Sequence, residues 1–157
     1  MQFDAATPAD AASLTRLINT AYRVEQFFVN GPRISESEVK TMLERGTFVV
    51  ARDEDRELAG CVFVEPKGAA GYLGLLSVDP ARQGRGLGSL LLDAAEVSLQ
   101  RAGCARIDIR VVNLRRELPA FYHRRGYRDC GVEPFTDPRA TQPCEFLLMS
   151  KTLPSNL

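Results

Sequence analysis

The sequence is poor in residues that bind metals. It contains a single histidine, His123, and four cysteines, none of which forms a C-x-x-C pair with another. Structural zinc sites are built from closely spaced ligands of these two types, so we expect no metal site. Cys61, Cys104, Cys130 and Cys144 lie in or beside apolar runs. That placement favours buried structural thiols over a catalytic cysteine, which would need a neighbouring base or cation.

An excess of charge of one sign is also missing. The 20 lysines and arginines balance 20 aspartates and glutamates, giving a formal net charge of +0. No global field therefore attracts nucleic acid or an anionic membrane. No run approaches the roughly 18 to 20 apolar residues that span a bilayer, and no N-terminal segment pairs a basic stretch with an apolar run. We expect a cytoplasmic protein whose partner is a small molecule or another protein.

The length of 157 residues and the ordinary composition are typical of one soluble domain, which we expect to extend over residues 1–157. No repeat, low-complexity tract or linker interrupts it. Hydrophobic periodicity, caps and turn residues predict a definite order of elements. They are a strand over 2–6, a helix beginning at Thr7-Pro8, a helix over 35–45, strands over 48–51, 59–64 and 72–78, a helix from the glycines near 88 to about 101, a strand over 106–112, a helix over 117–125, and strands over 127–132 and 144–151.

The most informative segment is Gln83 to Gly88, which reads Gln-Gly-Arg-Gly-Leu-Gly between an apolar strand and a Leu- and Ala-rich helix. Glycine permits tight turns and positive φ, and it lets a ligand approach the main chain closely. The first amides of the following helix have no partners within the helix, and the helix dipole adds partial positive charge there. Arg82 and Arg85 add full charges. The segment therefore predicts a site for an anion such as phosphate.

Three phosphate-binding patterns use such a turn, and spacing separates them. A P-loop requires a lysine after its last glycine, and none is present. The dinucleotide fingerprint requires a third glycine where Ser89 stands, although Asp108 on the next predicted strand could imitate its ribose-binding acid. The pattern Q/R-x-x-G-x-G/A is matched by Gln83, Gly86 and Gly88. With that match the segment resembles the acyl-CoA pyrophosphate loop of the GNAT family of N-acetyltransferases. A plain loop before a helix is the remaining alternative.

A second motif strengthens this resemblance. The segment from Ala120 to Tyr127, which contains Phe121 and Tyr122 before Gly126, is similar to the late helix of the family, A-x-x-F-Y-x-x-x-G-F/Y. Its alanine lies nearer the aromatic pair than is usual. Asn113 matches an asparagine that family members often use to hold the pantetheine arm. The element order also fits the family over residues 2–153. The resemblance implies an α/β (α+β) fold with a mixed, mostly antiparallel central sheet of about six to seven strands, flanked by about four helices.

The resemblance further implies acetyl-CoA as co-substrate and direct attack by a primary amine on the thioester, without an acyl-enzyme. Main-chain groups of the strand that ends at Val78 would bind pantetheine and stabilise the oxyanion where this strand splays from its neighbour. Arg124 and Arg125 either reach the 3′-phosphate of CoA or are ordinary solvated residues. The cofactor-binding residues expected from the resemblance are Leu76, Ser77, Val78, Gln83, Gly84, Arg85, Gly86, Leu87, Gly88, Ser89, Asn113 and Arg124.

Tyr122 matches the usual general acid of the family. A tyrosine of pKa about 10 keeps its proton at neutral pH, whereas a thiol titrates near 8.5, so hydrogen bonding to the departing thiolate is as plausible as full proton transfer. The alternative role of Tyr122 is packing beside Phe121. For the base that helps to deprotonate the amine, Glu25 is the leading candidate, because it lies in the region where family members commonly build the acceptor site. His123 is the other, and Glu25 would otherwise be a surface acid.

Tyr22, Phe27 and Phe28 flank Glu25 and suggest a mixed apolar and polar acceptor pocket, or else a core that covers the sheet. The acceptor itself, a small molecule or a protein amine, is left open. Family members often pair through their late strands, so a homodimer is possible. Two other functions stay open: an acyl-CoA-binding regulatory module without catalysis, which does not need Tyr122, and a dinucleotide-binding domain, which needs a parallel sheet.

Overall fold

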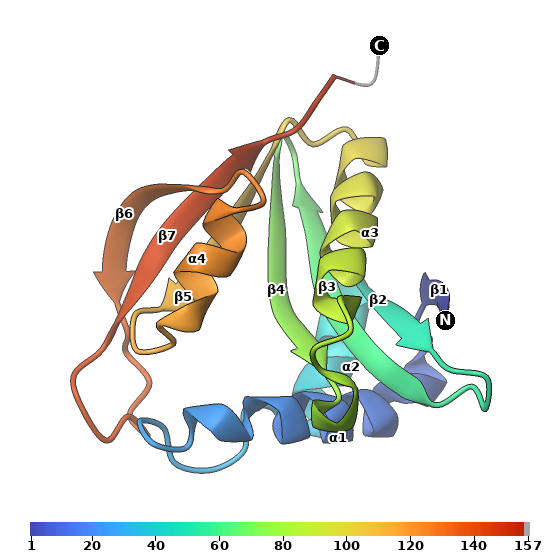
Figure 1. Ribbon diagram of the computed structural model, residues 1–157, viewed down its shortest axis with the longest axis horizontal. Coiled ribbons are helices and arrows are strands. Elements are labelled where there is room, and N and C mark those ends of the chain that lie inside the picture. The colour runs from blue at the N-terminus through green and yellow to red at the C-terminus, as the bar shows by residue number, and fades with distance from the viewer. Residues whose placement is uncertain (156–157) are drawn as a thin grey trace.

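The computed structural model describes residues 1–155, which form a seven-stranded sheet in the order β1-β2-β3-β4-β5-β7-β6 (Figure 1). The strands are β1 (Gln2–Ala5), β2 (Thr47–Arg52), β3 (Leu58–Lys67), β4 (Ala70–Val78), β5 (Arg106–Val112), β6 (Arg128–Pro134) and β7 (Glu145–Thr152). The helices are α1 (Ala11–Ala21), α2 (Glu36–Arg45), α3 (Leu87–Arg101) and α4 (Glu117–His123). The predicted mixed fold and the predicted order of elements are confirmed.

The helices begin where the local sequence predicts. Ser35 caps α2 and accepts a hydrogen bond from the Glu38 amide, while the Glu38 carboxylate accepts one from the Ser35 amide. This reciprocal capping box satisfies two of the amides that a helix start leaves without partners. Gly46 follows the last turn. Pro8 opens a short 3-10 turn that leads directly into α1, again behind a capping box that joins Thr7 and Asp10.

The sheet separates two hydrophobic layers. One face of the sheet packs against α1 and α2, and the other packs against α3 and α4. In Figure 1, α3 and α4 lie in front of the sheet and α2 lies behind it. Large, fully buried side chains fill both layers, among them Phe48, Phe63, Leu14 and Ile18 on the first face and Leu91, Leu92, Leu99, Ile107, Met149 and Tyr127 on the second.

The sheet is split in the middle, between β4 and β5. These strands form the parallel pair of the sheet, yet only Ala70–Tyr72 pair with Arg106–Asp108, and all other neighbouring strands are antiparallel. Beyond these pairs the two strands diverge like the arms of an inverted V (Figure 1). The predicted splaying of β4 is confirmed. A single short parallel pairing is incompatible with the parallel sheet of a dinucleotide-binding domain.

A β-bulge distorts β4 where the gap opens. Phe63 pairs with Gly74 and Cys61 pairs with Ser77, so β4 carries one more residue than β3 between these pairs. Leu75, in the bulge, has φ of 54°, which is unusual for a residue other than glycine. The buried Ser77 hydroxyl donates a hydrogen bond of 2.9 Å to the Leu75 carbonyl, and the Cys61 thiol lies 3.9 Å from the same oxygen. These contacts hold the bulge from inside the fold.

The prediction of buried thiols is correct for two cysteines only. Cys61 and Cys104 are buried, whereas Cys144 is half-buried and Cys130 is exposed. The reason is that β6, which carries Cys130, is an edge strand exposed along most of its length. Within residues 1–155, no helix combines the length and the apolar character needed to cross a membrane.

Candidate active site

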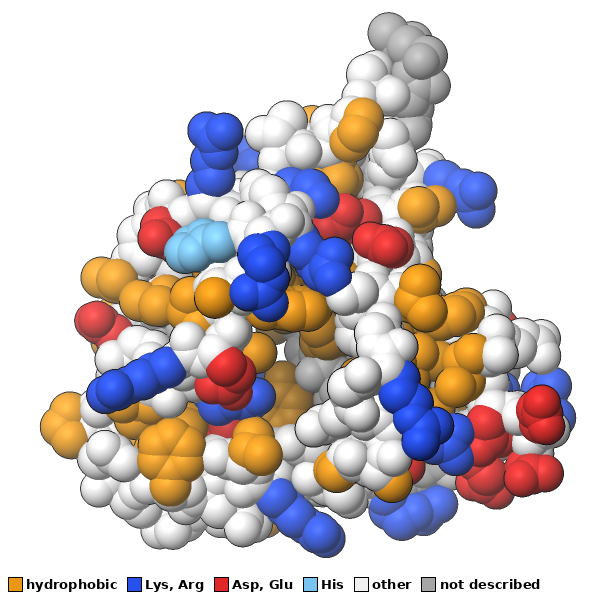
Figure 2. Space-filling model, viewed as in Figure 1, with side chains coloured by type: hydrophobic (Ala, Val, Ile, Leu, Met, Phe, Trp, Pro, Cys, Tyr) orange, Lys and Arg blue, Asp and Glu red, His pale blue; other side chains and the backbone are white. Residues whose placement is uncertain are grey.

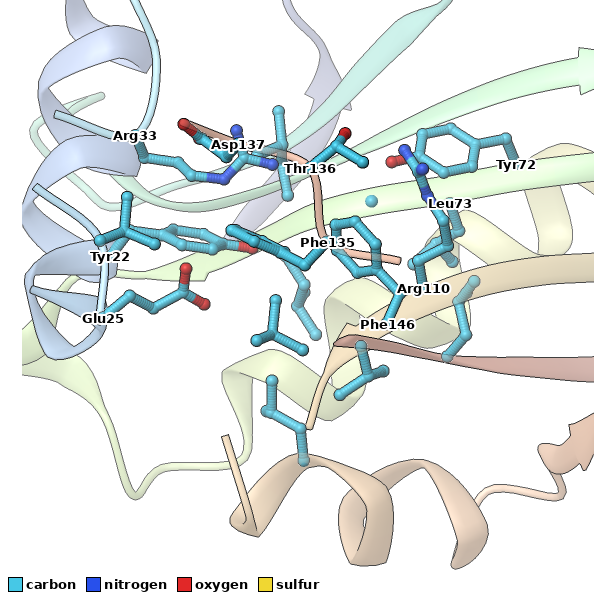
Figure 3. Close-up of a pocket in the computed structure, with 18 of the residues that line it drawn as sticks. Tyr22, Glu25, Arg33, Tyr72, Leu73, Arg110, Phe135, Thr136, Asp137 and Phe146 are labelled. Atoms are coloured by element: carbon cyan, nitrogen blue, oxygen red, sulfur yellow. The ribbon is translucent and has the colours of Figure 1, made fainter. Parts of the chain in front are cut away.

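A cavity of about 470 Å³ occupies the opening between β4 and β5 (Figure 3). Its walls come from four regions that are distant in the sequence: the segment between α1 and α2, the strand β4, the strand β5 with α4, and the loop after β6 with the start of β7. Figure 2 shows a hollow between the parts of the surface formed by α3 and α4, with basic side chains around it. The lining includes Tyr22, Glu25, Arg33, Tyr72, Leu73, Leu75, Leu76, Arg110, Tyr122, Phe135, Asp137 and Phe146.

The glycine turn leaves the start of α3 open to an anion. Gly84 and Gly86 adopt φ of 82° and 78°, and Gly86 is the N-cap of α3 without a side-chain hydrogen bond to the first turn. No acidic residue lies in that turn. The free amides and the positive end of the helix dipole therefore stay available, as the sequence predicts. The side-chain Nε2 of Gln83 donates a hydrogen bond of 3.3 Å to the Val78 carbonyl, which connects the turn to the end of β4.

Two arginines near this turn have different roles in the structure. Arg82 forms ion pairs with Asp53 at 2.5 Å and with Asp79 at 3.7 Å, so the charge expected from it is already neutralised. Arg85 is exposed and, within residues 1–155, forms no ion pair. Of the predicted pair of cations, only Arg85 retains a free positive charge.

The turn after α4 brings Arg125, not Arg124, to the start of α3. The Arg125 guanidinium donates a hydrogen bond to the Ser89 hydroxyl and lies 5.0 Å from the centre of the Phe121 ring. Its Nε is buried and has no hydrogen-bond partner in the described part of the chain. Arg124 is exposed, and within residues 1–155 its guanidinium forms no hydrogen bond, ion pair or aromatic contact. Of the two, the resemblance leads us to expect Arg124 among the cofactor-binding residues, because the sequence does not show which of two adjacent side chains faces α3.

Tyr122 is buried between aromatic rings, and it also faces the cavity. Only 7% of the residue is exposed, and its ring packs edge-on against Phe121 and Tyr127 at centroid distances of 5.2 and 5.4 Å. The two roles predicted for Tyr122, packing and chemistry, are thus compatible. Its hydroxyl forms no hydrogen bond within residues 1–155, and burial raises the pKa of Tyr122 to about 12. The hydroxyl remains protonated and available to a ligand.

Glu25 is a buried cavity residue, and the alternative that it is a surface acid is wrong. It is 8% exposed, and its carboxylate pairs with Arg115 at 2.9 Å. Arg115 in turn pairs with Glu117 at 2.7 Å. Burial raises the pKa of Glu25 above the usual range of a glutamate, and the positive charge of Arg115 opposes this shift only in part. The raised pKa makes the Glu25 carboxylate a stronger base than an exposed glutamate.

His123, Phe27 and Phe28, the other residues considered for the site, do not line the cavity. His123 is exposed, lies 2.9 Å from the Asp129 carboxylate, and does not line the cavity. Phe28 is a fully buried core residue, whereas Phe27 is 56% exposed. Of the aromatic residues around Glu25, Tyr22 alone reaches the cavity.

Asn113, directly after β5, connects this strand to the start of β7. Its carboxamide oxygen accepts a hydrogen bond of 2.9 Å from the Glu145 amide, and its own amide donates one to the Glu145 carbonyl. The side-chain nitrogen has no partner in the described residues and stays free for a ligand. The structure thus gives Asn113 a role in joining β5 to β7 that the sequence does not reveal.

Several cavity residues have no motif that would identify them. Tyr72, Arg110 and Phe146 come from three strands whose order in the sheet the sequence does not state. Arg110 lies 4.8 Å from the centre of the Phe146 ring and pairs with Glu133 at 2.8 Å. The alternation of side chains along each predicted strand indicates on which face of the sheet such a residue lies. It does not indicate which residues of other strands lie beside it.

Replacing Ser77 with alanine should destabilise the bulge and slow any reaction at the cavity. The Leu75 carbonyl would lose its buried hydroxyl donor, which costs about 1–3 kcal/mol of unfolding free energy. Urea denaturation measures the stability, and initial rates measure the turnover. Thr15→Val is the matched control, because it removes the hydroxyl that binds the Ala11 carbonyl within α1. Ser77→Ala with unchanged turnover would show that the bulge holds its shape without this contact.

Comparison with known proteins connects this architecture to a family. The sequence model of the acetyltransferase (GNAT) domain matches residues 44–129, more than half of the chain. The chain belongs to the GNAT acetyltransferase family. The matched region contains β4 with its bulge, the glycine turn, α3 and α4, so the resemblance inferred from the two sequence motifs is confirmed.

Curated and solved relatives agree with this assignment. The chain is 36% identical over 85 residues to a mycothiol acetyltransferase of Clavibacter michiganensis subsp. michiganensis; the match covers 54% of the chain and 28% of that protein. The chain therefore spans less than a third of the length of this relative. The GNAT fold also matches the ribosomal-protein-S18-alanine N-acetyltransferase of Escherichia coli, with a TM-score of 0.83, 18% identity, and coverage of 99% and 97% of the two chains.

An aminoglycoside 6'-N-acetyltransferase solved with coenzyme A has the same fold, with a TM-score of 0.80. Its identity is 21%, and the alignment covers 100% of this chain and 99% of that one. The names of these three acetyltransferases differ, so the likeness does not name an acceptor for this chain.

Proposed function

We propose that the protein transfers an acetyl group from acetyl-CoA to a primary amine by direct attack of the amine on the thioester. The observation that carries this proposal is the continuous cavity between β4 and β5. The Tyr122 hydroxyl, which has no partner in residues 1–155, and the buried Glu25 carboxylate both line this cavity, together with the bulged part of β4. Family membership and the relative solved with coenzyme A support the choice of donor.

The donor would lie along β4 and end at the glycine turn. Main-chain groups of Leu76, Ser77 and Val78 have no strand partner on the β5 side, so pantetheine can pair with them as an added strand. The pyrophosphate would bind the turn from Gln83 to Ser89 and the first amides of α3. We also assign Arg125 to this site, because its guanidinium already contacts Ser89. The Asn113 side-chain nitrogen would hold the pantetheine arm.

The acceptor amine would enter from the side of Glu25. An α-amino group titrates near 8 and a lysine near 10.4, so a base must remove a proton before attack. Glu25, with its raised pKa, takes this proton directly or through water. The nitrogen then attacks the thioester carbon. The main-chain amide of Leu76, at the bulge, would stabilise the oxyanion, and collapse of the tetrahedral intermediate releases the CoA thiolate.

Tyr122 would stabilise the departing thiolate by hydrogen bonding. With the pKa of Tyr122 near 12 and that of a thiol near 8.5, complete proton transfer would be uphill by about 5 kcal/mol. A hydrogen bond to the developing charge avoids that cost and is strengthened by the low dielectric of the buried site. The attacking nitrogen would lose its second proton to solvent as the amide forms, and the thiolate would take a proton from solvent after release.

Acetyl-CoA should raise the melting temperature by about 5 to 11 °C at 100 times its dissociation constant, whereas NAD should leave it unchanged. The shift follows because the ligand binds only the folded chain, and its stabilisation of about 2.7 kcal/mol corresponds to a few degrees per kcal/mol for a chain of this size. Differential scanning fluorimetry measures it. A shift with NAD and none with acetyl-CoA would contradict the proposed donor.

Two glycine variants test where the donor lies. Gly86 and Gly68 both have positive φ, 78° and 69°. At either position a Cβ atom would have no other atom within 4 Å. Valine at either position should therefore cause similar backbone strain. Only Gly86→Val should abolish the stabilisation by acetyl-CoA, because its side chain would occupy the space in front of the α3 amides.

A further inference from the structure

Among the charged residues that line the cavity, Arg33 is the one that forms no direct ion pair within residues 1–155. The charged lining residues are Glu25, Arg33, Arg110, Asp137 and Arg139. Ion pairs account for all of them except Arg33: Glu25 with Arg115, Arg110 with Glu133, and Asp137 with Arg139. Within residues 1–155, Arg33 forms no hydrogen bond and no ion pair through its guanidinium. Arg33 is exposed at the rim of the cavity, and its charge acts to lower the pKa of both Glu25 and Asp137 without forming an ion pair with either, so its N–H groups remain available to a ligand.

Arg33 is held in place by contacts on both sides of it. The Pro32 carbonyl accepts a hydrogen bond of 2.6 Å from Arg139, and the side chain of Asn19 binds both the amide and the carbonyl of Ile34 at 2.9 Å. The Arg33 guanidinium lies over the Tyr22 ring at 5.4 Å from its centre. Stacking on an aromatic face restricts the side chain while its N–H edge stays open.

The position of Arg33 relative to Glu25 indicates which chemical groups the acceptor carries. Figure 3 shows the Tyr22 ring between Arg33 and Glu25, with all three residues on the same side of the cavity. A guanidinium edge matches the geometry of a carboxylate or a phosphate and binds either through paired hydrogen bonds. We infer that the acceptor carries an anionic group, a carboxylate or a phosphate, in addition to its primary amine. Arg33 binds this group while the amine lies at Glu25.

This inference rests on the proposed acetyltransferase function, and the experiment separates the two. Acceptor use is measured as thiol release from acetyl-CoA with two matched pairs of amines: propylamine against γ-aminobutyrate, and ethanolamine against phosphoethanolamine. The anionic member of at least one pair should have a kcat/KM about 10-fold or more above its neutral partner, since a hydrogen bond to a charged group has this effect. The pair that shows the preference identifies the anion as carboxylate or phosphate.

Substitution of Arg33 tests whether this residue causes the preference. Arg33→Gln should raise KM for the preferred anionic amine by about 10- to 30-fold, with little change for its neutral partner or for acetyl-CoA. Arg33→Lys keeps the charge and should restore part of the preference. Arg23→Gln is the matched control, because Arg23 is an exposed residue of the same segment that does not line the cavity.

The outcomes distinguish the two proposals. Stabilisation by acetyl-CoA together with equal use of neutral and anionic amines would overturn the inference and leave the proposed function intact. If none of the four amines is acetylated, each is titrated into the CoA complex. A thermal shift by an anionic amine that Arg33→Gln removes supports the inference, and no shift by either anionic amine overturns it. Absence of any acetyl-CoA binding would instead contradict the proposed function.

Discussion

Replacing Tyr122 with phenylalanine should lower kcat by about 100- to 1,000-fold and leave KM for acetyl-CoA nearly unchanged. The reason is that the Tyr122 hydroxyl faces the cavity and, within residues 1–155, has no partner of its own, so its hydrogen bond is made to the reacting group. Its ring packing is retained in the variant. Steady-state thiol release with a saturating amine gives kcat, and titration of acetyl-CoA gives KM.

Tyr127→Phe is the matched control for this variant. Tyr127 is also buried, its ring lies 5.4 Å from that of Tyr122, and its hydroxyl binds Glu96 at 2.8 Å, outside the cavity. Its loss should reduce stability without lowering kcat. Wild-type turnover in Tyr122→Phe would remove Tyr122 from the mechanism. A wild-type protein that binds acetyl-CoA but releases no thiol with any amine would favour the regulatory module.

Replacing Glu25 with glutamine should lower kcat/KM by about 100-fold at neutral pH and remove the acid limb of its pH profile. In the wild type this limb marks protonation of the Glu25 carboxyl. Because burial raises the pKa of Glu25, kcat/KM should begin to fall, as the pH is lowered, at a pH above the usual range of a glutamate. Rates measured from about pH 4 to about pH 9 define the limb.

Glu117→Gln is the control for the electrostatics of Glu25. Glu117 is the second carboxylate bound to Arg115, but its side chain is 64% exposed and does not line the cavity. This variant removes a charge that helps to raise the pKa of Glu25, so it should keep the rate at neutral pH and retain the acid limb, shifted to lower pH. An unchanged acid limb in Glu25→Gln would assign the titration to another group, such as the amine itself.

Much of the fold was predictable because its signals are local. The capping box at Ser35 and Glu38, the alternation in residues 106–112, and Gly46 as the end of α2 act over a few residues, and each element appears close to its predicted bounds. Local signals are weaker at the edges of the fold. Cys130 lies in a segment that the sequence predicts as a strand, but this strand is at the edge of the sheet, which depends on the sheet order.

The site shows the same division. The sequence by itself determined the glycine turn before α3 and the aromatic pair of α4, because each motif lies within one short segment. Only the tertiary structure decided which arginine reaches Ser89, that Glu25 is buried against Arg115, and that Arg33 forms no ion pair within residues 1–155. These properties depend on contacts between residues up to about 90 positions apart, as in the Glu25–Arg115 pair. Burial and charge pairing arise from packing, and no local pattern encodes them.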